Sequence, residues 1–465
     1  MANSQNNGQN QEKRTREENA RESVFLAEKG EKPCKKSKNP LWPCLIAAGI
    51  ALVSFGGGVL ARQLSLDKEM RSLIRLKNRV QNSYYQEITD EEFYKTLFDA
   101  VSNELLDDYS KYMTADEYAQ SRSDAKGEQS GVGLVFSTQT ASGKDQLFVQ
   151  RVCGNSPAEA AGIVAGDYVL GFGASESEIT ESVRFDEFVE FLANYAAGEP
   201  FYVKFQSQGV VRLWKEAYVE NYVFYRTSEN GYCFTGKSAN VLTEQGEPLS
   251  FLDDDTAYIR LTQFNGAAVE EFSQAMNLMK VQQKSNLVLD LRGNGGGYLD
   301  IMREISSYFC KTAQEDEPVV AVADYGEYRE EFTAPDNTYW NYFNENSRVC
   351  VLADRDTASA SECLIGCMID YGTISYGDIC LFERDGEAKT YGKGIMQTTY
   401  PLGGFGGDAV KLTTARICWP KELYCIHGRG ILPQDGTLTV SKGGLGDEAL
   451  KSAIEKLFTA DSERD

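Results

Sequence analysis

The sequence has very little histidine. His427 is the single one among 465 residues, so a Ser-His-Asp or Cys-His mechanism would have to use it as the base. It stands beside a glycine-rich turn, where an ordinary surface or core residue is the expectation. A catalytic base is therefore to be sought mainly among other residue types.

Basic charge is scarce as well. The chain has 47 Lys and Arg against 69 Asp and Glu, which gives a formal net charge of −22. Binding to nucleic-acid phosphates requires a basic surface, so no DNA or RNA partner is expected. The hydrophobic content of 42% is ordinary for a globular protein, and the length favours two or three domains.

No two of the eleven cysteines have the CxxC spacing of a zinc site, so a structural metal is not expected. Cys34 and Cys44 lie near the amino terminus, and the nine others cannot all pair within one chain. Cys363 and Cys367 are four apart, which would place both on one face of a helix. Small core residues are expected there, rather than a redox or metal pair.

The first forty residues are polar and end in a basic cluster, which is typical of a disordered cytoplasmic tail, 1–40. The uncharged run from Leu41 to Ala61 is long enough to cross a bilayer core of about 30 Å. More Lys and Arg precede the run than follow it, so everything beyond Ala61 is expected outside the cytoplasm. The prediction is an uncleaved single-pass anchor in the cell membrane at 41–61, with a cleaved signal peptide as the alternative.

Three further regions differ in their periodicity. Residues 62–127 have apolar residues at helical spacing. Residues 128–214 change to short strands and glycine turns with one amphipathic helix, as in a small compact domain. Residues 215–460 alternate strands and helices, which predicts an α/β layer with buried, largely parallel strands and functional residues at the strand ends.

The first candidate site is TASASE, Thr357 to Glu362, between an apolar strand and a helix. A serine at such a turn presents its hydroxyl near helix N-terminal N–H groups, which can stabilise an oxyanion. A structural helix cap is the alternative, because serine is a favoured capping residue.

The second candidate site is the glycine turn of LDLRGNGGG, Asp290 to Gly297. Glycines directly after a buried strand let backbone N–H groups face a ligand. The spacing is neither Walker A nor GxGxxG, so nucleotide binding is not favoured, and a plain glycine turn is the alternative.

The third candidate site is YGKGIMQ, which contains Lys393. A lysine can deprotonate a serine only when it is neutral, so its pKa must be lowered by burial among apolar groups. Tyr391, Ile395 and Met396 could form those surroundings, and Gln397 could hydrogen-bond the amine. A solvated turn lysine is the alternative.

Together these segments resemble the carboxyl-terminal processing (tail-specific) serine proteases, a family with a PDZ domain. The resemblance covers about residues 105–440 and is carried, in the family's order, by DDYSKYMTADEY, GVGLVF, NSPAEAAGIVAGDYVLGF, YIRLTQF, LVLDLRGNGGG, TASASE, YGKGIMQ, KLTTARICWP and RGILPQ. It implies an α/β protease core (215–460) with a crotonase/ClpP-like layered sheet and an inserted PDZ domain (128–214).

The resemblance also assigns a catalytic pair. Ser359, directly before ASE, is the expected nucleophile, and Ser361 is not. Lys393 of the GKGxxQ pattern is the expected base, which Gln397 orients. The stretch between Ser359 and Lys393 is longer than usual in the family, through an insertion around LFERDGEAKT, and Lys389 is the alternative base.

The oxyanion would be held by two backbone N–H groups, those of Ala360 and of one glycine in the NGGG turn. Gly296 is our choice over its two neighbours. The family often has a proline where this chain has Gly295, which should loosen the turn. The mechanism needs neither a metal nor an organic cofactor.

In the PDZ resemblance, the loop Gly131, Val132, Gly133 and Leu134 would offer backbone N–H groups to a substrate's terminal carboxylate. The expected partners are therefore proteins or peptides with free C-termini and the membrane, and a homo-oligomer is conceivable. Two rivals are a catalytically silent PDZ scaffold and an acyl-transfer enzyme acting on thioesters. The Ser, Lys and Gln set disfavours the first, while the anchor and the PDZ pattern disfavour the second.

Overall fold

The computed structural model describes residues 67–462, except 142–143, 165, 181–183, 236–240, 245–247, 312–316, 336–338, 340, 385, 404–406 and 441–446. The tail and anchor expected at 1–40 and 41–61 lie outside the described residues. Within the described part, none of the helices combines the length and the apolar character needed to cross a membrane.

The chain divides into two compact units, residues 1–95 and 96–465. In the first unit, helix α3 (Lys68–Ser83) is capped by Asp67, whose carboxylate accepts from the Met70 N–H at 2.7 Å. Helix α4 (Asp90–Leu105) follows, and Lys77 of α3 pairs with Asp90 at 2.9 Å. The described part of the region 62–127 therefore contains helices, while its role as a separate region stays a prediction.

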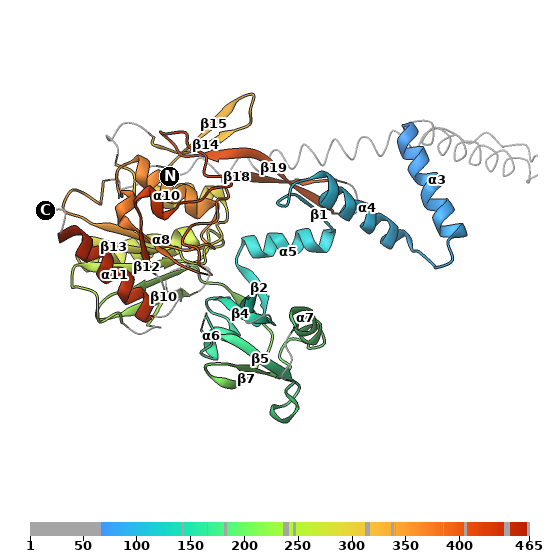
Figure 1. Cartoon of the computed structure of the whole chain (residues 1–465), viewed down its shortest axis with the longest axis horizontal. Coiled ribbons are helices and arrows are strands. Elements are labelled where there is room, and N and C mark those ends of the chain that lie inside the picture. The colour runs from blue at the N-terminus through green and yellow to red at the C-terminus, as the bar shows by residue number, and fades with distance from the viewer. Residues whose placement is uncertain are drawn as a thin grey trace, which may run out of the picture. The chain divides into compact units, whose positions relative to one another are not determined.

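The main sheet of the second unit has eight strands in the order β11-β10-β9-β12-β13-β16-β17-β20 (Figure 1). Neighbours from β12 to β20 are parallel, and those from β11 to β12 are antiparallel. The predicted α/β core with largely parallel strands is therefore confirmed. The strands are β9 (Val223–Arg226), β10 (Gly231–Thr235), β11 (Val241–Glu244), β12 (Thr256–Leu261), β13 (Asn286–Asp290), β16 (Val349–Ala353), β17 (Ile379–Phe382) and β20 (Leu438–Val440).

Helices cover both faces of this sheet, which explains why its central strands are apolar throughout. Along β13, Leu287 and Leu289 join one core with Phe272, while Val288 between them joins a second core with Ile454. Side chains alternate across a strand, so the two cores lie on opposite faces. The helices are α8 (Ala268–Val281), α9 (Leu299–Ser306) and α10 (Ala360–Asp370) on the first face, and α11 (Asp447–Ser462) on the second.

A second sheet is built on the long strand β19, which pairs with β1, β14 and β18, and β15 pairs with β14. Lys393 lies two residues before β18, so this sheet fixes the position of the expected base. Helix α5 (Ala115–Ala125) follows β1. The strands are β1 (Lys111–Met113), β14 (Val319–Asp324), β15 (Arg329–Thr333), β18 (Ile395–Pro401) and β19 (Ala409–Cys418).

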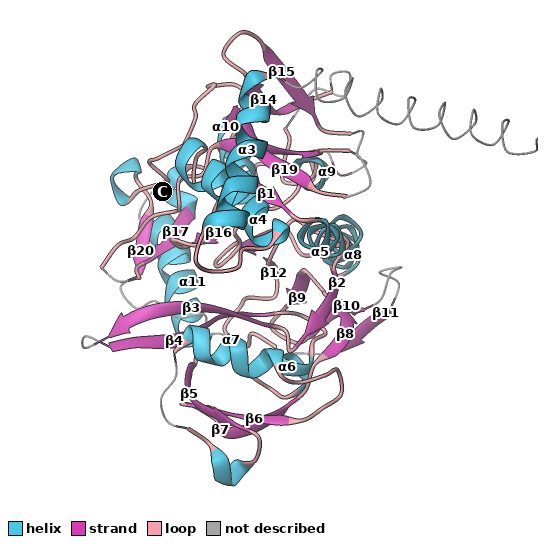
Figure 2. Cartoon of the chain, turned by 90° about the vertical axis from the view of Figure 1, so that its right-hand side faces the viewer, coloured by secondary structure: helices cyan, strands magenta, loops and turns pink. Residues whose placement is uncertain are grey.

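Residues 134–213 form a smaller antiparallel sheet, β3-β4-β5-β6-β7, with its own apolar core that includes Phe188 and Phe201 (Figure 2). Strand β3 is at its edge. The ribbon β2 and β8 joins this module to the core, where Arg151 forms an ion pair with the buried Glu220. That the module is a PDZ domain stays a prediction. Its elements are β2 (Glu128–Gly131), β3 (Leu134–Ala141), β4 (Lys144–Val152), α6 (Pro157–Ala160), β5 (Tyr168–Gly173), α7 (Phe185–Ala193), β6 (Phe201–Phe205), β7 (Gly209–Leu213) and β8 (Glu216–Val219).

Candidate active site

Ser359 stands at the sharp turn between β16 and α10 with a strained backbone. Its φ of 57° and ψ of −117° lie in a region that side chains other than glycine rarely adopt. Such strain costs about 1–3 kcal/mol and resembles the nucleophile elbow of hydrolases, which exposes a serine hydroxyl above a sheet. The turn is held because Ala358 donates its N–H to the Asn294 carbonyl at 3.0 Å.

The neighbouring Ser361 has a different position. It is fully buried, and its hydroxyl donates to the Asn294 carbonyl at 3.0 Å. Ser359, in contrast, is partly exposed and lines a cavity. The local geometry therefore favours Ser359 as the reactive serine and gives Ser361 a structural hydrogen bond.

The glycine turn lies directly beside the nucleophile. A Cβ on Gly296 would come within 2.7 Å of the Ser359 Cβ and 2.9 Å of the Ala360 nitrogen. Gly296 has a φ of 100°, which also favours glycine. The backbone at Gly296 therefore packs closely against Ser359, and a side chain at position 296 would force the two segments apart.

The oxyanion donors that the family resemblance implies are the N–H groups of Ala360 and of a glycine, expected to be Gly296. In the structure the Gly296 N–H donates to the Asn294 side-chain oxygen at 2.9 Å, and the Asn294 amide donates to the Leu261 carbonyl at 2.9 Å. Gly296 could serve an oxyanion only by sharing or opening its bond to Asn294. Which glycine donates stays a prediction.

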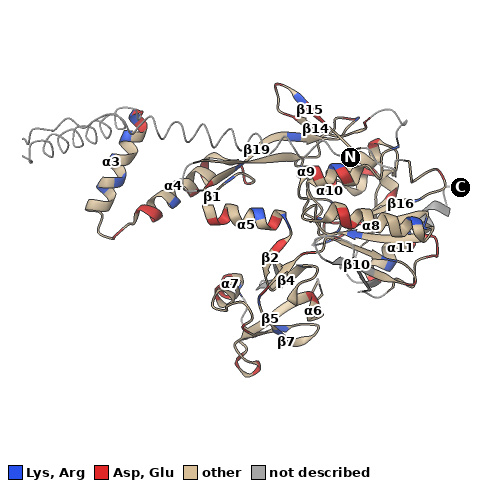
Figure 3. Ribbon diagram, turned by 180° about the vertical axis from the view of Figure 1, so that it is seen from behind, with Lys and Arg blue, Asp and Glu red and all other residues tan. Residues whose placement is uncertain are grey.

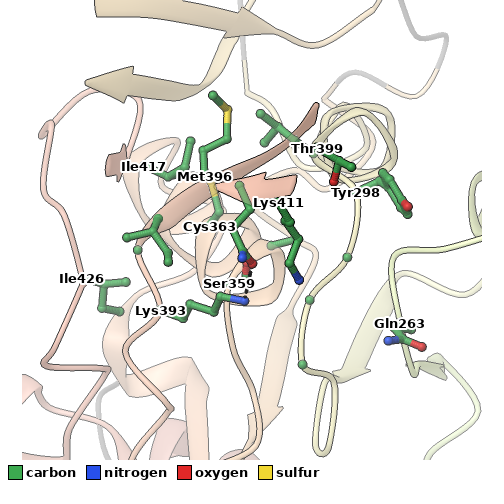
Figure 4. A pocket seen from close by; sticks show the side chains of 18 of the residues that line it. Gln263, Tyr298, Ser359, Cys363, Lys393, Met396, Thr399, Lys411, Ile417 and Ile426 are labelled. Atoms are coloured by element: carbon green, nitrogen blue, oxygen red, sulfur yellow. Dashed lines mark hydrogen bonds between the residues drawn. The ribbon is translucent and has the colours of Figure 1, made fainter. Parts of the chain in front are cut away.

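Lys393 is half-buried and held by two neighbours. Its ammonium donates to the Gln397 side-chain oxygen at 2.9 Å and lies 5.1 Å from the centre of the Tyr109 ring. Gln397 in turn donates to the Tyr109 carbonyl. In Figure 4 the Lys393 side chain extends toward the part of the cavity that holds Ser359.

The electrostatic surroundings of Lys393 favour its neutral form. Burial lowers the pKa of Lys393, the positive charge of Lys411 lowers it further, and the Asp107 carboxylate acts in the opposite direction. A lysine that loses its proton more easily than usual can accept one from a serine hydroxyl. The lowered pKa of Lys393 meets the condition stated above for a lysine that acts as the base of a serine.

Glu362 was not singled out by the sequence analysis, although it ends the TASASE motif. Its buried carboxylate accepts from the backbone N–H groups of Ser359 at 3.1 Å, Gly392 at 2.8 Å and Lys393 at 2.8 Å. It also accepts from the Thr390 hydroxyl at 2.6 Å. One side chain therefore fixes both the nucleophile turn and the loop that carries the lysine.

The segment DDYSKYM also contributes to the site. Besides the contacts of Tyr109, the Ser110 hydroxyl accepts from the Thr413 N–H on β19 at 2.8 Å. In the sequence, the only indication of this contribution is that the motif DDYSKYMTADEY carries part of the family resemblance. These contacts tie the start of the second unit to β18 and β19, next to Lys393.

The cavity itself measures about 350 Å³. Its lining combines Ser359, Lys393 and Gln397 with an apolar wall. Lys389 and His427 are not among the lining residues. Lys389 pairs with Glu387 at 2.8 Å, and His427 is exposed. The lining consists of Ser121, Gln263, Gly295, Gly296, Gly297, Tyr298, Leu299, Ser359, Ala360, Cys363, Lys393, Gly394, Ile395, Met396, Gln397, Thr399, Lys411, Ile417, Trp419 and Ile426.

The core domain is similar to known serine proteases. Residues 255–435 match the model of peptidase family S41. A CtpA-like serine protease of Staphylococcus epidermidis is 26% identical over 416 residues, which cover 86% of this chain and 75% of the relative. The carboxy-terminal processing protease CtpB of Bacillus subtilis is 23% identical over 373 residues, 79% and 67% of the two chains. The solved structure of an S41 protease from Bacteroides fragilis has a TM-score of 0.50 at 15% identity, covering 81% of this chain and 91% of that one.

The fold and these matches define the class of the protein, an α/β serine peptidase. The enzyme is a serine peptidase of the C-terminal processing type, similar to peptidase family S41 over residues 255–435. The family match begins after the module of residues 128–214 and thus speaks for the core alone.

Proposed function

We propose that the chain is a membrane-anchored serine endopeptidase in which Ser359 is the nucleophile and Lys393 the base. Its substrates are proteins that the module of residues 128–214 recognises near their C-termini. The observation that carries the proposal is Glu362, which holds the strained Ser359 turn and the Lys393 loop against one cavity. A buried carboxylate is costly unless hydrogen bonds compensate it, and the donors that compensate Glu362 come from both the Ser359 turn and the Lys393 loop.

In the proposed mechanism, neutral Lys393 accepts the Ser359 proton while the serine oxygen attacks the peptide carbonyl. The resulting oxyanion is stabilised by the Ala360 N–H and by an N–H of the glycine turn. Lys393 then gives its proton to the leaving amine, and an acyl-enzyme remains. Water, deprotonated by the same lysine, releases the product and restores Ser359.

The module of residues 128–214 is proposed to bind the substrate's tail. Strand β3 is at the edge of its sheet, and an extended peptide can add to such an edge. Helix α7 lies against it, since the Phe136 and Phe188 rings are 5.2 Å apart. Phe185 and Val189 of α7 are 50% and 48% exposed, which suits an apolar last residue. The loop Gly131–Leu134, which leads into β3, would receive the carboxylate.

A scaffold that binds peptide tails without cleaving them is the alternative. It would use the same edge strand and need no exposed serine beside a lysine of lowered pKa. The strain at Ser359 therefore favours the peptidase.

The dyad is tested by single substitutions in the purified chain, with an internally quenched peptide as substrate. Ser359→Ala and Lys393→Ala should each lower kcat by at least about a thousandfold, because neither half of the pair acts well alone. Ser361→Ala and Lys389→Ala are the matched controls and should keep most of the activity. An active Ser359→Ala variant, or a dead Lys389→Ala beside an active Lys393→Ala, would refute the assignment.

A further inference from the structure

A second lysine, Lys411, lines the catalytic cavity, and no aspartate or glutamate is among the lining residues. Lys411 is on β19 directly opposite Thr399 of β18, while Gln397 is opposite Thr413 in the same ladder. Positions two apart on a strand share a face, so Lys411 is on the same face as Gln397, about 7 Å along the strand. Figure 4 shows Lys411 and Lys393 both reaching into the cavity.

The charge of Lys411 has no counter-ion within the described part of the chain. No hydrogen bond or ion pair joins its ammonium to any described residue, and its neighbour across the sheet in β1 is another cation, Lys111. Burial and the Lys111 charge both lower the pKa of Lys411. Like charges directly opposite each other destabilise a sheet, so the pair Lys111 and Lys411 lowers the stability of this part of the fold.

Acidic residues are plentiful elsewhere. The chain has 69 of them, and Figure 3 shows both charge signs spread over the helices and loops of the described residues. A surplus of positive charge at one place in such an acidic protein is therefore a local feature. It lies in the cavity where a substrate must enter, and an anionic group of the substrate would neutralise it.

We propose that Lys411, together with its cross-strand neighbour Lys111, forms a subsite for a carboxylate of the substrate. The inference rests on the proposed peptidase function and names a substrate preference of the same cavity. The apolar wall of Ile395, Ile417 and Trp419 receives a neighbouring apolar side chain. The carboxylate belongs either to an acidic residue within about three positions of the scissile bond or to the free terminus of a tail that has left the loop Gly131–Leu134 and entered the cavity.

The test compares matched peptides in the natural chain and in Lys411→Met. One set replaces each residue within three positions of the scissile bond by Glu or by Gln, and a second set has an acid or an amide terminus. The natural chain should prefer one carboxylate peptide by about tenfold in kcat/KM. The ratio should fall to about one in Lys411→Met and persist in Lys411→Arg and in the distant control Lys451→Met.

Ratios within one variant cancel any effect of Lys411 on the basicity of Lys393, because both peptides use the same base. A Glu/Gln preference that disappears in Lys411→Met identifies an acidic side chain as the ligand, and an acid/amide preference that disappears identifies the terminus. Equal cleavage of all pairs by the natural chain, or Glu/Gln and acid/amide ratios that are both unchanged in Lys411→Met, would overturn the subsite alone. An acid/amide ratio that persists by itself belongs to the module of residues 128–214. A natural chain that cleaves none of the peptides would overturn the proposed function with it.

Discussion

Glu362 makes the two halves of the proposed dyad interdependent at the scale of single residues. Its carboxylate binds the backbone of Ser359 and of Lys393, which are on separate segments of the chain. Burial raises the pKa of Glu362, while its four hydrogen bonds favour the charged form. A change that loosens this carboxylate would therefore move nucleophile and base together.

The protonation of Lys393 gives a prediction about pH. Because only the neutral amine is a base, kcat/KM should rise with pH as Lys393 loses its proton. Lys411 lowers the pKa of Lys393, so Lys411→Met should raise that pKa and move the rising limb of the profile to higher pH. The measurement is the pH profile of kcat/KM with an uncharged peptide.

Lys451→Met, on the C-terminal helix α11, is the control for this experiment and should leave the limb in place. If the rising limb of the pH profile is unchanged in Lys411→Met, or moves to lower pH, Lys411 does not lower the pKa of the base.

At the scale of elements, helix α8 places a buried acid against the strand that leaves the module. Glu271 accepts from the N–H groups of Tyr222 and Val223 at 2.8 and 2.9 Å, at the start of β9. Burial raises the pKa of Glu271 to about 8 from its ordinary value of 4.5, although these two hydrogen bonds oppose the shift. The acid thus joins α8 to β9 in a way that depends on pH.

This shift predicts how stability varies with pH. Between about 4.5 and 8 the folded state holds a proton on Glu271 that the unfolded state has lost, so stability should fall as pH rises through this window. Glu271→Gln should remove this loss of stability, on the order of 4 kcal/mol between pH 5 and pH 8, while keeping an acceptor for the two N–H groups. The melting temperature measured at pH 5 and pH 8 checks it, with the exposed Glu270→Gln as control. A pH dependence equal in all three chains would contradict the prediction.

Element order and the strand-turn-helix around Ser359 were predictable because their signals are local. An apolar run, a small-residue turn and an apolar helix pattern follow one another in the sequence. The contacts of Glu362 with the loop that carries Lys393 could not be predicted, because they join residues 31 apart that only the folded core brings together. The contact of Gln397 with Tyr109 spans 288 residues. The role proposed for Lys411 has no signal in the sequence KLTTAR, because it depends on which residues lie opposite Lys411 in the folded sheet.

At the scale of the whole molecule, the module and the core are expected to act on one substrate. If the module binds tails, amidating the C-terminus of a good substrate should lower its kcat/KM about tenfold, because backbone donors lose their carboxylate. A variant lacking about residues 128–214 should show little difference between acid and amide. Competition kinetics of the two peptides measures both ratios. Equal cleavage by the full chain would reject tail recognition and leave the dyad intact.

The location of the protein in the cell follows from its amino-terminal sequence. The uncharged run at 41–61 with basic residues before it predicts an uncleaved anchor and a peptidase outside the cytoplasm. Protease added to intact cells should therefore digest the core domain. Immunoblotting of a C-terminal tag measures the digested fraction. Replacing Lys32, Lys35, Lys36 and Lys38 by Gln should reduce the digested fraction, because these charges hold the tail inside. A soluble mature chain that starts near Arg62 would instead show a cleaved signal, and full protection in intact cells would place the peptidase inside.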